Sequence, residues 1–274
     1  MAVAKKGRVL AVAGSDPSGG AGIQADIKTV TALGGYAAAA ITALTVQNSK
    51  GVTDVLPVPA GFVADQMKAV LADIGADCVK TGMLYDIATI QRVADVLVEN
   101  HHAAALVIDP VMMATSGDTL MQSGAIEMIK DRLFPLADLV TPNTIEAGLL
   151  TGIEITDTKH MLQAAEILLA AGANAVLVKG GHLPGNKLAD ILVPSVGETI
   201  VIESHRISTK HTHGTGCTMA SAIAALLAQG QTLADAFRHA HAYVRQAIEL
   251  APGFGAGHGP LGHAAAAPYF HKAD

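Results

Sequence analysis

The short sequence HGTGC, which ends at Cys217, has the composition of an anion-binding turn at the start of a helix. Gly214 and Gly216 let the backbone turn tightly, so that successive N–H groups can point at one spot. The Ala- and Leu-rich sequence that follows predicts a helix over 216–229, whose dipole adds positive potential at its N-terminus. We interpret the turn, with Thr215, as a phosphate site. The alternative is an ordinary glycine-rich helix N-cap.

Charged side chains follow three apolar segments, at the points where strands are predicted to end. Asp109 follows VI in VIDPV, Glu146 lies in TPNTIE, and Lys179 ends VLVK. The two carboxylates suit a hydrated Mg²⁺ on a nucleotide triphosphate, and the lysine suits one of the phosphates. Each residue also has a structural interpretation. Asp109 can form a turn, Glu146 can complete a capping box with Asn143, and Lys179 can be a solvated strand end.

Gln47 follows another apolar segment, in TALTVQNSK. Its amide offers both a donor and an acceptor, which suits the edge of a heteroaromatic ring. The alternative is a loop amide whose hydrogen bonds stay within the protein.

These residues need a scaffold that brings distant parts of the chain together. Short apolar strands alternate with helical segments, and the strands are predicted over 8–14, 36–46, 77–83, 105–112, 137–143 and 175–181. Nearly continuous apolar strands indicate a parallel sheet that is covered by helices on both faces. Six strand exits carry polar residues, so we expect a site at the carboxyl edge of the sheet.

The ends of the predicted sheet differ from its centre. The sequence DVLPVP is predicted to be an edge strand, because Pro57 cannot donate to a central ladder. The segments 188–195 and 198–207 are predicted to pair as a hairpin, and a second closing helix is predicted over 232–249. No linker divides the chain, so we expect one domain over residues 1–274.

The composition excludes several classes of partner. The chain has 274 residues, a net charge of −6, no Trp and only 3% aromatic residues, which argues against a nucleic-acid partner. The longest apolar stretch, near 36–46, is too short to span a bilayer. Two distant cysteines give no disulfide framework, and no signal peptide is recognised, so we expect a cytoplasmic protein.

Three familiar motifs are incomplete. GSDPSGGAG lacks the G-K-[ST] ending of a phosphate loop, and GHGPLG at 257–262 follows no strand. A zinc site at His211, His213 and Cys217 lacks a second ligand cluster, so we expect His213 to shape the loop instead. Cys78 is expected in the core.

Seven segments in order resemble one family: GSDPSGGAGIQADIKT, TALTVQNSKG, KTGML, DPVMMATSGD, TPNTIEA, KGGH and HGTGCT. The chain is similar here to the hydroxymethylpyrimidine/phosphomethylpyrimidine kinases of thiamine biosynthesis, from about residue 8 to residue 250. The resemblance implies a ribokinase-like α/β fold, a three-layer α/β/α sandwich with a mostly parallel sheet. It implies that ATP and Mg²⁺ phosphorylate 4-amino-5-hydroxymethyl-2-methylpyrimidine twice, and that the protein is a homodimer.

The resemblance also implies roles for individual residues. Gln47 matches the residue that reads the pyrimidine ring, and the turn at 214–217 matches an anion hole over the transferring phosphoryl group. Asp109, Glu146 and Lys179 match magnesium- and ATP-side residues. The positions that match the surroundings of the ring are Gly14, Ala21, Asp26, Met83 and Val111.

Cys217 matches the position of a catalytic base that is aspartate in the sugar kinases of the superfamily. A helix dipole is expected to lower the pKa of its thiol, which would let it deprotonate a neutral alcohol. In the second step the acceptor is an anionic phosphate, which a neutral thiol would not repel and a carboxylate would. The alternative is that Cys217 is simply small and buried.

Three other functions compete with this one. A pyridoxal kinase of the same superfamily shares the phosphate site, and Gln47 and Met83 favour the pyrimidine. A non-catalytic pyrimidine or nucleotide sensor would lack an acid at 109 or 146, and both acids are present. In a sugar kinase, Cys217 would be a poor substitute for aspartate.

Overall fold

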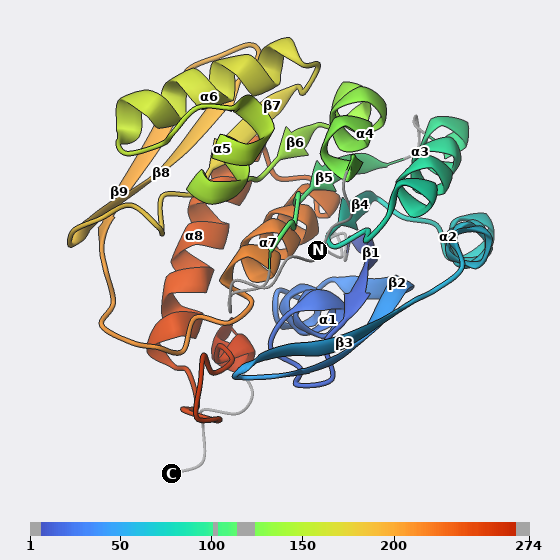
Figure 1. The fold of residues 1–274 in the computed structure, drawn as a ribbon, viewed down its shortest axis with the longest axis horizontal. Coiled ribbons are helices and arrows are strands. Elements are labelled where there is room, and N and C mark those ends of the chain that lie inside the picture. Colours follow the sequence, from blue (N-terminus) through green and yellow to red (C-terminus); the bar gives the residue numbers. More distant parts are fainter. Residues whose placement is uncertain (1–6, 101–103, 114–123, 267–274) are drawn as a thin grey trace, which may run out of the picture.

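A nine-stranded sheet runs through the protein in the computed structural model, which describes residues 7–100, 104–113 and 124–266 (Figure 1). Its order is β3-β2-β1-β4-β5-β6-β7-β8-β9. The strands are β1 (Arg8–Ser15), β2 (Tyr36–Asn48), β3 (Gly51–Pro57), β4 (Cys78–Thr81), β5 (Ala105–Ile108), β6 (Leu139–Val140), β7 (Ala175–Val178), β8 (Lys187–Pro194) and β9 (Ile200–His205).

The pairing matches the predicted parallel sheet with antiparallel ends. The six central strands of the sheet, β2, β1, β4, β5, β6 and β7, run parallel. The strands β3, β8 and β9 are antiparallel to their neighbours. The strand β3 is an edge strand with Pro57 at its end, as expected, but it begins at Gly51. The strands β5, β6 and β7 end before the predicted polar residues, which form loops, whereas β4 includes Lys80 and Thr81.

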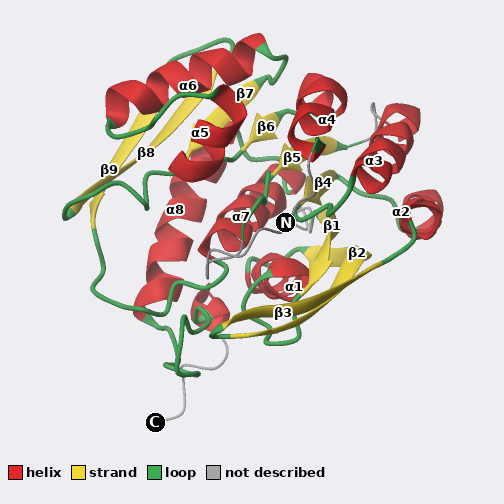
Figure 2. Cartoon of the chain, viewed as in Figure 1, coloured by secondary structure: helices red, strands yellow, loops and turns green. Residues whose placement is uncertain are grey.

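Helices cover both faces of the sheet (Figure 2). Side chains alternate along the central strands, so that Leu106 and Ile108 of β5 pack into one apolar cluster and Val107 packs into the other. One face carries α2 (Ala60–Asp73), α3 (Ile87–Asn100), α4 (Ala125–Arg132), α5 (Thr144–Thr151) and α6 (Thr158–Ala170). The other carries α1 (Gly22–Ala32), α7 (Thr215–Ala228) and α8 (Leu233–Glu249). Short 3₁₀ turns follow at Phe134–Leu136 and His263–Ala266.

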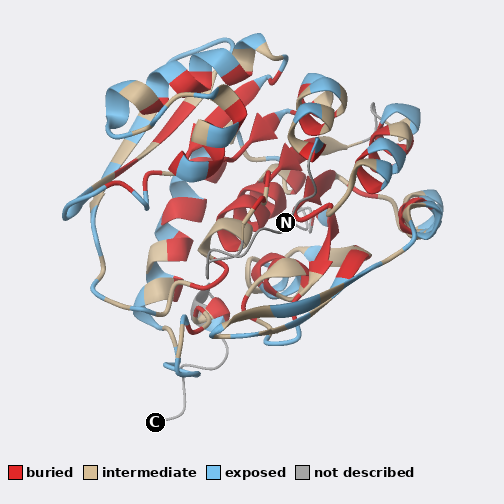
Figure 3. Ribbon diagram, in the orientation of Figure 1, coloured by how far each residue is buried: buried red, intermediate tan, exposed pale blue. Residues whose placement is uncertain are grey.

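The helix α7 is the most deeply buried helix on its face (Figure 3). Its alanines let it pack closely between α1 and α8 and over β1, β4 and β5. Because other elements surround α7 along most of its length, it has no solvent-facing side, which explains why its sequence is apolar all round. This packing fixes where the N-terminus of α7 points.

Both cysteines are free thiols in the structure. Cys78 is completely buried in the core, as expected, and Cys217 is half-buried at the start of α7. Over the described ranges, none of the helices combines the length and the apolar character needed to cross a bilayer.

Candidate active site

A cavity of about 610 Å³ lies at the carboxyl edge of the sheet, where the polar strand exits were expected to meet. It is lined by residues that follow β1, β2, β4, β5, β6 and β7, and by the first turn of α7. All but one of the predicted site residues line it: Gly14, Ala21, Gln47, Met83, Asp109, Val111, Glu146, Lys179, Gly214, Thr215, Gly216 and Cys217.

The turn before α7 opens into this cavity. Gly214 is the N-cap residue and has φ +81°, a left-handed conformation that favours glycine. A Cβ at this position would also collide with the carbonyl oxygen of Gly20, so the two loops touch at backbone level. A Cβ on Gly216 would lie 3.1 Å from Lys179 Nζ and 3.8 Å from Asp109 Oδ2. The helix N-terminus therefore faces the predicted nucleotide-side residues directly.

Asp109 and Lys179 form an ion pair beside that turn. Lys179 Nζ donates to Asp109 Oδ1 at 2.8 Å, and Thr141 Oγ1 donates to the same oxygen at 2.9 Å. Burial alone would raise the pKa of Asp109, but Lys179 and Lys80 outweigh it and the pKa is lowered. Asp109 Oδ2 is buried and has no hydrogen-bond partner among the described residues. It is an acceptor available to a bound cation or its water.

Glu146 fulfils both of the interpretations proposed for it. The backbone N–H of Asn143 donates to Glu146 Oε2 at 2.8 Å, and the backbone N–H of Glu146 donates to Asn143 Oδ1 at 2.9 Å. These two bonds complete the capping box of α5. The carboxyl group also lines the cavity. Burial raises its pKa to about 7, although Lys179 acts in the opposite direction.

The carboxylates are few, which fits a magnesium ion better than a protein-only metal site. In the described part of the chain, His, Cys, Asp and Glu form no cluster of three or more that could hold a metal ion, so the zinc alternative has no support there. Mg²⁺ is commonly held by one or two carboxylates together with substrate phosphates and water. Asp109 and Glu146 provide that number, and the unpartnered Asp109 oxygen has the hard-donor chemistry that Mg²⁺ prefers.

Asp26 does not line the cavity, and its expected place around the substrate ring stays a prediction. Its side chain is fully buried, where Lys80 Nζ lies 2.8 Å from Oδ1 and Ser221 Oγ donates to the same oxygen at 2.6 Å. Packing of α1 against β1, β2 and α7 turns the carboxylate inward. Lys80 was not singled out from the sequence, although a lysine within an apolar strand was a visible signal.

The expected lowering of the Cys217 pKa is wrong for the unliganded protein. Burial raises the pKa of this thiol to about 11; Lys80 acts to lower it, and Asp26 and Asp109 act to raise it. The favourable position at the helix N-terminus does not compensate for the loss of water. Cys217 is therefore a neutral thiol near pH 7 in the empty cavity.

Gln47 is held by side chains on both sides of its amide. Thr45 Oγ1 donates to Gln47 Oε1 at 3.1 Å, and Gln47 Nε2 lies 3.4 Å from His213 Nε2. His213 Nε2 also lies 2.9 Å from Asp16 Oδ2. His213 thus connects the turn before α7 to the loop after β1, which fits the expectation that it shapes the loop.

Asp16 organises that loop and was missed in the sequence. Its carboxylate accepts hydrogen bonds from Ser18 and from the backbone amides of Gly20 and Ala21. Burial alone would raise the pKa of Asp16, but these donors and His213 outweigh it and the pKa is lowered. The signal was an aspartate directly before P-S-G-G, which is the pattern of a side chain that closes a turn.

The cavity continues toward β8, β9 and α8, and its residues there were also missed. Arg206 donates to the carbonyl oxygens of Gly181 and Leu183 at 3.0 Å and 2.6 Å, which joins the loop after β7 to the end of β9. His182, Asp190, His241 and Arg245 line the same end of the cavity. The hairpin β8–β9 carries too little sequence signal to place these residues from the sequence alone.

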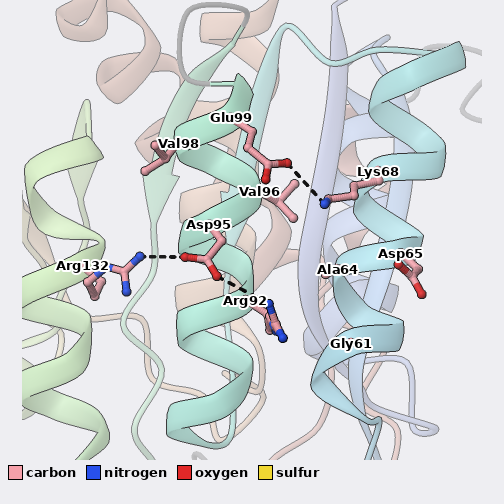
Figure 4. A pocket seen from close by; sticks show the side chains of 10 residues that line it. All are labelled: Gly61, Ala64, Asp65, Lys68, Arg92, Asp95, Val96, Val98, Glu99 and Arg132. Atoms are coloured by element: carbon pink, nitrogen blue, oxygen red, sulfur yellow. Dashed lines mark hydrogen bonds and ion pairs between the residues drawn. The ribbon is translucent and has the colours of Figure 1, made fainter.

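A second cavity, of about 500 Å³, lies among α2, α3 and α4, and Figure 4 shows its lining. Five of its charged side chains pair with one another: Lys68 with Glu99 at 3.3 Å, and Arg132 and Arg92 with Asp95 at 2.8 Å and 3.8 Å. It contains none of the predicted site residues. The carboxyl-edge cavity is therefore the candidate active site.

Comparison with known proteins decides the family. A family model for phosphomethylpyrimidine kinase matches residues 16–262, which is most of the chain. The chain belongs to the phosphomethylpyrimidine kinase family. Its fold is ribokinase-like and its activity is that of a kinase, in agreement with the sequence analysis.

Individual relatives of this kinase agree with the assignment. It is 47% identical to a hydroxymethylpyrimidine/phosphomethylpyrimidine kinase of Rhizobium meliloti, over 93% of this chain and 96% of that one. It is 52% identical to a thiamine biosynthesis bifunctional protein of Geobacter sulfurreducens, over 96% of this chain. This chain covers about half, 53%, of the length of that bifunctional protein.

A solved structure shows how similar a vitamin kinase with another substrate can be. The pyridoxal kinase of Staphylococcus aureus, in complex with pyridoxal, has a TM-score of 0.86 and 35% sequence identity, over 94% of both chains. The sequence is more similar to the Rhizobium kinase, at 47% identity, and to the Geobacter bifunctional protein, at 52%, than to this pyridoxal kinase, at 35%.

Proposed function

We propose that the protein transfers the γ-phosphoryl group of ATP to 4-amino-5-hydroxymethyl-2-methylpyrimidine, and then phosphorylates the monophosphate to the diphosphate. The observation that supports it best is the convergence of three parts in one cavity. The amides before α7, the Asp109–Lys179 pair and the Gln47 amide all line the same space. A sensor would need only the ring-binding side of this arrangement.

The nucleotide would lie on the Lys179 side of the cavity. Lys179 would neutralise a phosphate charge, and the amides of residues 214–217 would bind the phosphoryl group in flight. A hydrated Mg²⁺, bound through Asp109 and Glu146, would supply further neutralisation of the phosphate charge. These groups are held in place before the substrate arrives, by the capping box of α5 and by the packing of α7.

The acceptor would lie on the Gln47 side. Gly14, Ala21, Met83 and Val111 line this side, and a Cβ on Gly14 would lie 3.3 Å from Met83 Sδ. Glycine at this position therefore leaves room for the Met83 side chain, which in turn lines the acceptor side of the cavity. Thr45 and His213 would hold the Gln47 amide so that it reads the ring edge.

In the first transfer, Cys217 would first release its thiol proton to water, and the resulting thiolate would accept the proton of the acceptor hydroxyl group. The acceptor oxygen would bond to the γ-phosphorus as the bond from that phosphorus to ADP breaks. In the second transfer the acceptor is a phosphate oxygen that needs no base, and a neutral thiol does not repel it. The raised pKa of Cys217 in the empty cavity, about 11, suits the second transfer as it stands.

One assay tests the proposal. The protein is incubated with the pyrimidine, ATP and Mg²⁺, and the products are followed by mass spectrometry for monophosphate and diphosphate. A parallel reaction contains pyridoxal in place of the pyrimidine. Sequential appearance of both pyrimidine products, at a kcat/KM well above that for pyridoxal, is expected. Phosphorylation of pyridoxal alone would overturn the proposed substrate.

We also propose that the protein is a cytoplasmic homodimer. The thiol of Cys217 must stay reduced, which fits a reducing compartment. The strands β2 and β3 carry exposed apolar residues on the face opposite the cavity, with Leu44 directly across from Leu56 and Val46 beside them. An apolar surface of this kind on a sheet edge favours association with a second copy.

A further inference from the structure

Asp26 and Lys80 form an ion pair that no step above uses. The two charged atoms lie 2.8 Å apart, and neither side chain has any exposed surface. Taking two charges out of water costs several kcal/mol per ion, and an apolar pair of similar volume is often as stable. Stability alone is therefore a weak reason for the presence of this pair beside a reaction site.

The pair is attached to the helix that carries Cys217. Ser221 Oγ donates to Asp26 Oδ1 at 2.6 Å, so α7 contacts the carboxylate directly. Ser221 follows Cys217 by four residues, which places both side chains on one face of the helix, one turn apart. The ion pair consequently lies beneath the first turn of α7, on the side that the thiol occupies.

The ammonium group lies close to the floor of the cavity. A Cβ on Gly82 would lie 3.1 Å from Lys80 Nζ, and the next residue, Met83, lines the cavity. Lys80 is thus a positive charge at the carboxyl end of β4 that water and substrate do not reach. Among the described residues, the Lys80 ammonium group donates a hydrogen bond to one side chain, that of Asp26.

Four charged groups surround the thiol from four elements. Asp26 comes from α1 and Lys80 from β4, while Asp109 and Lys179 follow β5 and β7. Lys80 makes the largest electrostatic contribution that favours the thiolate, and the two aspartates oppose it. The balance between Lys80 and Asp26 therefore controls how easily the thiol ionises.

We propose that Lys80 is a positioning residue for phosphoryl transfer, because it holds a fixed positive charge beneath Cys217 that stabilises the thiolate. Asp26, together with Ser221, holds the ammonium group in place and limits its effect. The inference rests on the proposed role of Cys217 as the base. It assigns Asp26 to the support of that base and not to the substrate ring.

The test measures thiolate formation without the kinase reaction. The rate of alkylation of Cys217 by iodoacetamide, an uncharged reagent, is followed at pH 8.5 and located by mass spectrometry. Lys80→Met should slow alkylation at least about tenfold, the effect of one pKa unit. Asp26→Asn, which keeps an acceptor for Ser221, should accelerate it. The double variant should fall between the wild type and Lys80→Met.

The double variant keeps the test decisive if an unpaired buried charge prevents either single variant from folding. Lys68→Met removes an exposed lysine far from the site and should leave the rate unchanged. Cys78 is fully buried and should remain unmodified in every folded variant. Equal alkylation rates in the wild type and the double variant would overturn the inference. So would a shift of the rate in the same direction by Lys80→Met and Asp26→Asn.

The result is separable from the proposed kinase function. Altered alkylation in a protein that phosphorylates neither pyrimidine would support the electrostatic role and reject the substrate. Normal phosphorylation with unchanged alkylation would reject only the role of Lys80. The pH profile of kcat/KM for the first transfer should move to higher pH in Lys80→Met, which a purely structural role does not require.

Discussion

At the scale of single residues, the site combines groups whose protonation states depend on burial. Burial raises the pKa of Cys217 to about 11 and that of Glu146 to about 7, whereas nearby lysines keep Asp109 ionised. The helix dipole is only one of several contributions to such a balance. The pKa of a base at the N-terminus of α7 therefore depends on charged residues that lie outside the local sequence around Cys217.

Substitution of Cys217 should separate the two transfers. Cys217→Ala should slow the first transfer on the order of 10²-fold, the usual contribution of a general base, and affect the second less. Cys217→Asp should retain the first and lose the second, because two like charges 4 Å apart repel by about 4 kcal/mol at the effective dielectric of a protein surface. Single-turnover rates for each acceptor measure both effects. Equal losses of both steps in both variants would contradict the proposed role.

At the scale of secondary-structure elements, the proposed anion hole depends on a close approach of two loops. Gly214 combines φ +81° with a backbone contact to the carbonyl group of Gly20, and Asp16 holds that second loop in place. The turn before α7 and the loop after β1 are therefore one unit, although they lie far apart in the sequence.

Gly214→Ala should disrupt this unit. A left-handed φ costs a non-glycine residue about 1–2 kcal/mol, and here the added Cβ also pushes Gly20 away. Gly34→Ala is the matched control, because Gly34 has φ +82° and a Cβ there would meet no atom within 4 Å. Both variants should lose stability in urea denaturation, but only Gly214→Ala should lose phosphoryl transfer. Comparable activity in the two variants would count against the loop contact.

The last described turn is anchored to the helical layer by a buried histidine. His263 Nε2 lies 3.0 Å from Thr218 Oγ1 of α7, and the His263 carbonyl oxygen accepts a hydrogen bond from Tyr243 of α8. Burial lowers the pKa of His263 from 6.5 to about 4, so the folded protein holds this ring neutral. Unfolding at acidic pH therefore takes up a proton.

This linkage predicts how stability depends on pH. The contribution is fully present above pH 6.5 and is lost as the pH falls toward 4, because the unfolded chain binds the proton first. Between pH 7.5 and pH 5.0 the free energy of unfolding should drop by about 2 kcal/mol through this group. Urea denaturation of wild type and His263→Gln at both pH values isolates it, since the variant should lack this part of the drop. Identical drops in both proteins would show that His263 is not responsible.

At the scale of the whole molecule, one sheet separates the chemistry from the proposed dimer surface. Gln47 and Thr45 of β2 line the cavity, while Leu44 and Val46 alternate with them on the exposed face. A single strand therefore contributes to the site with one face and presents apolar residues with the other.

Leu56→Glu should disrupt the proposed dimer. The charge would be buried in the proposed interface, opposite Leu44, and burial of a charge is costly. Light scattering coupled to size-exclusion chromatography should give half of the wild-type mass. Val196→Glu, in the exposed turn between β8 and β9, should leave the mass unchanged. A monomeric wild type would reject the dimer outright.

The sequence by itself determined the parallel sheet, the edge strand at Pro57, the family and the turn before α7. These features depend on local patterns: apolar runs, glycines that need special backbone conformations, and polar residues at strand exits. Local patterns also predicted that Asp109, Glu146, Lys179 and Gln47 would meet at one edge, because parallel strands end together.

Only the tertiary structure decided the direction in which side chains point and the charges that surround them. Asp26 follows the loop after β1 closely in sequence, yet the packing of α1 against β1, β2 and α7 turns it into the core toward Lys80. The pKa of Cys217 likewise depends on Lys80, Asp26 and Asp109, which come from three other segments of the chain. Burial and long-range electrostatics are properties of the assembled fold, so no local pattern contains them.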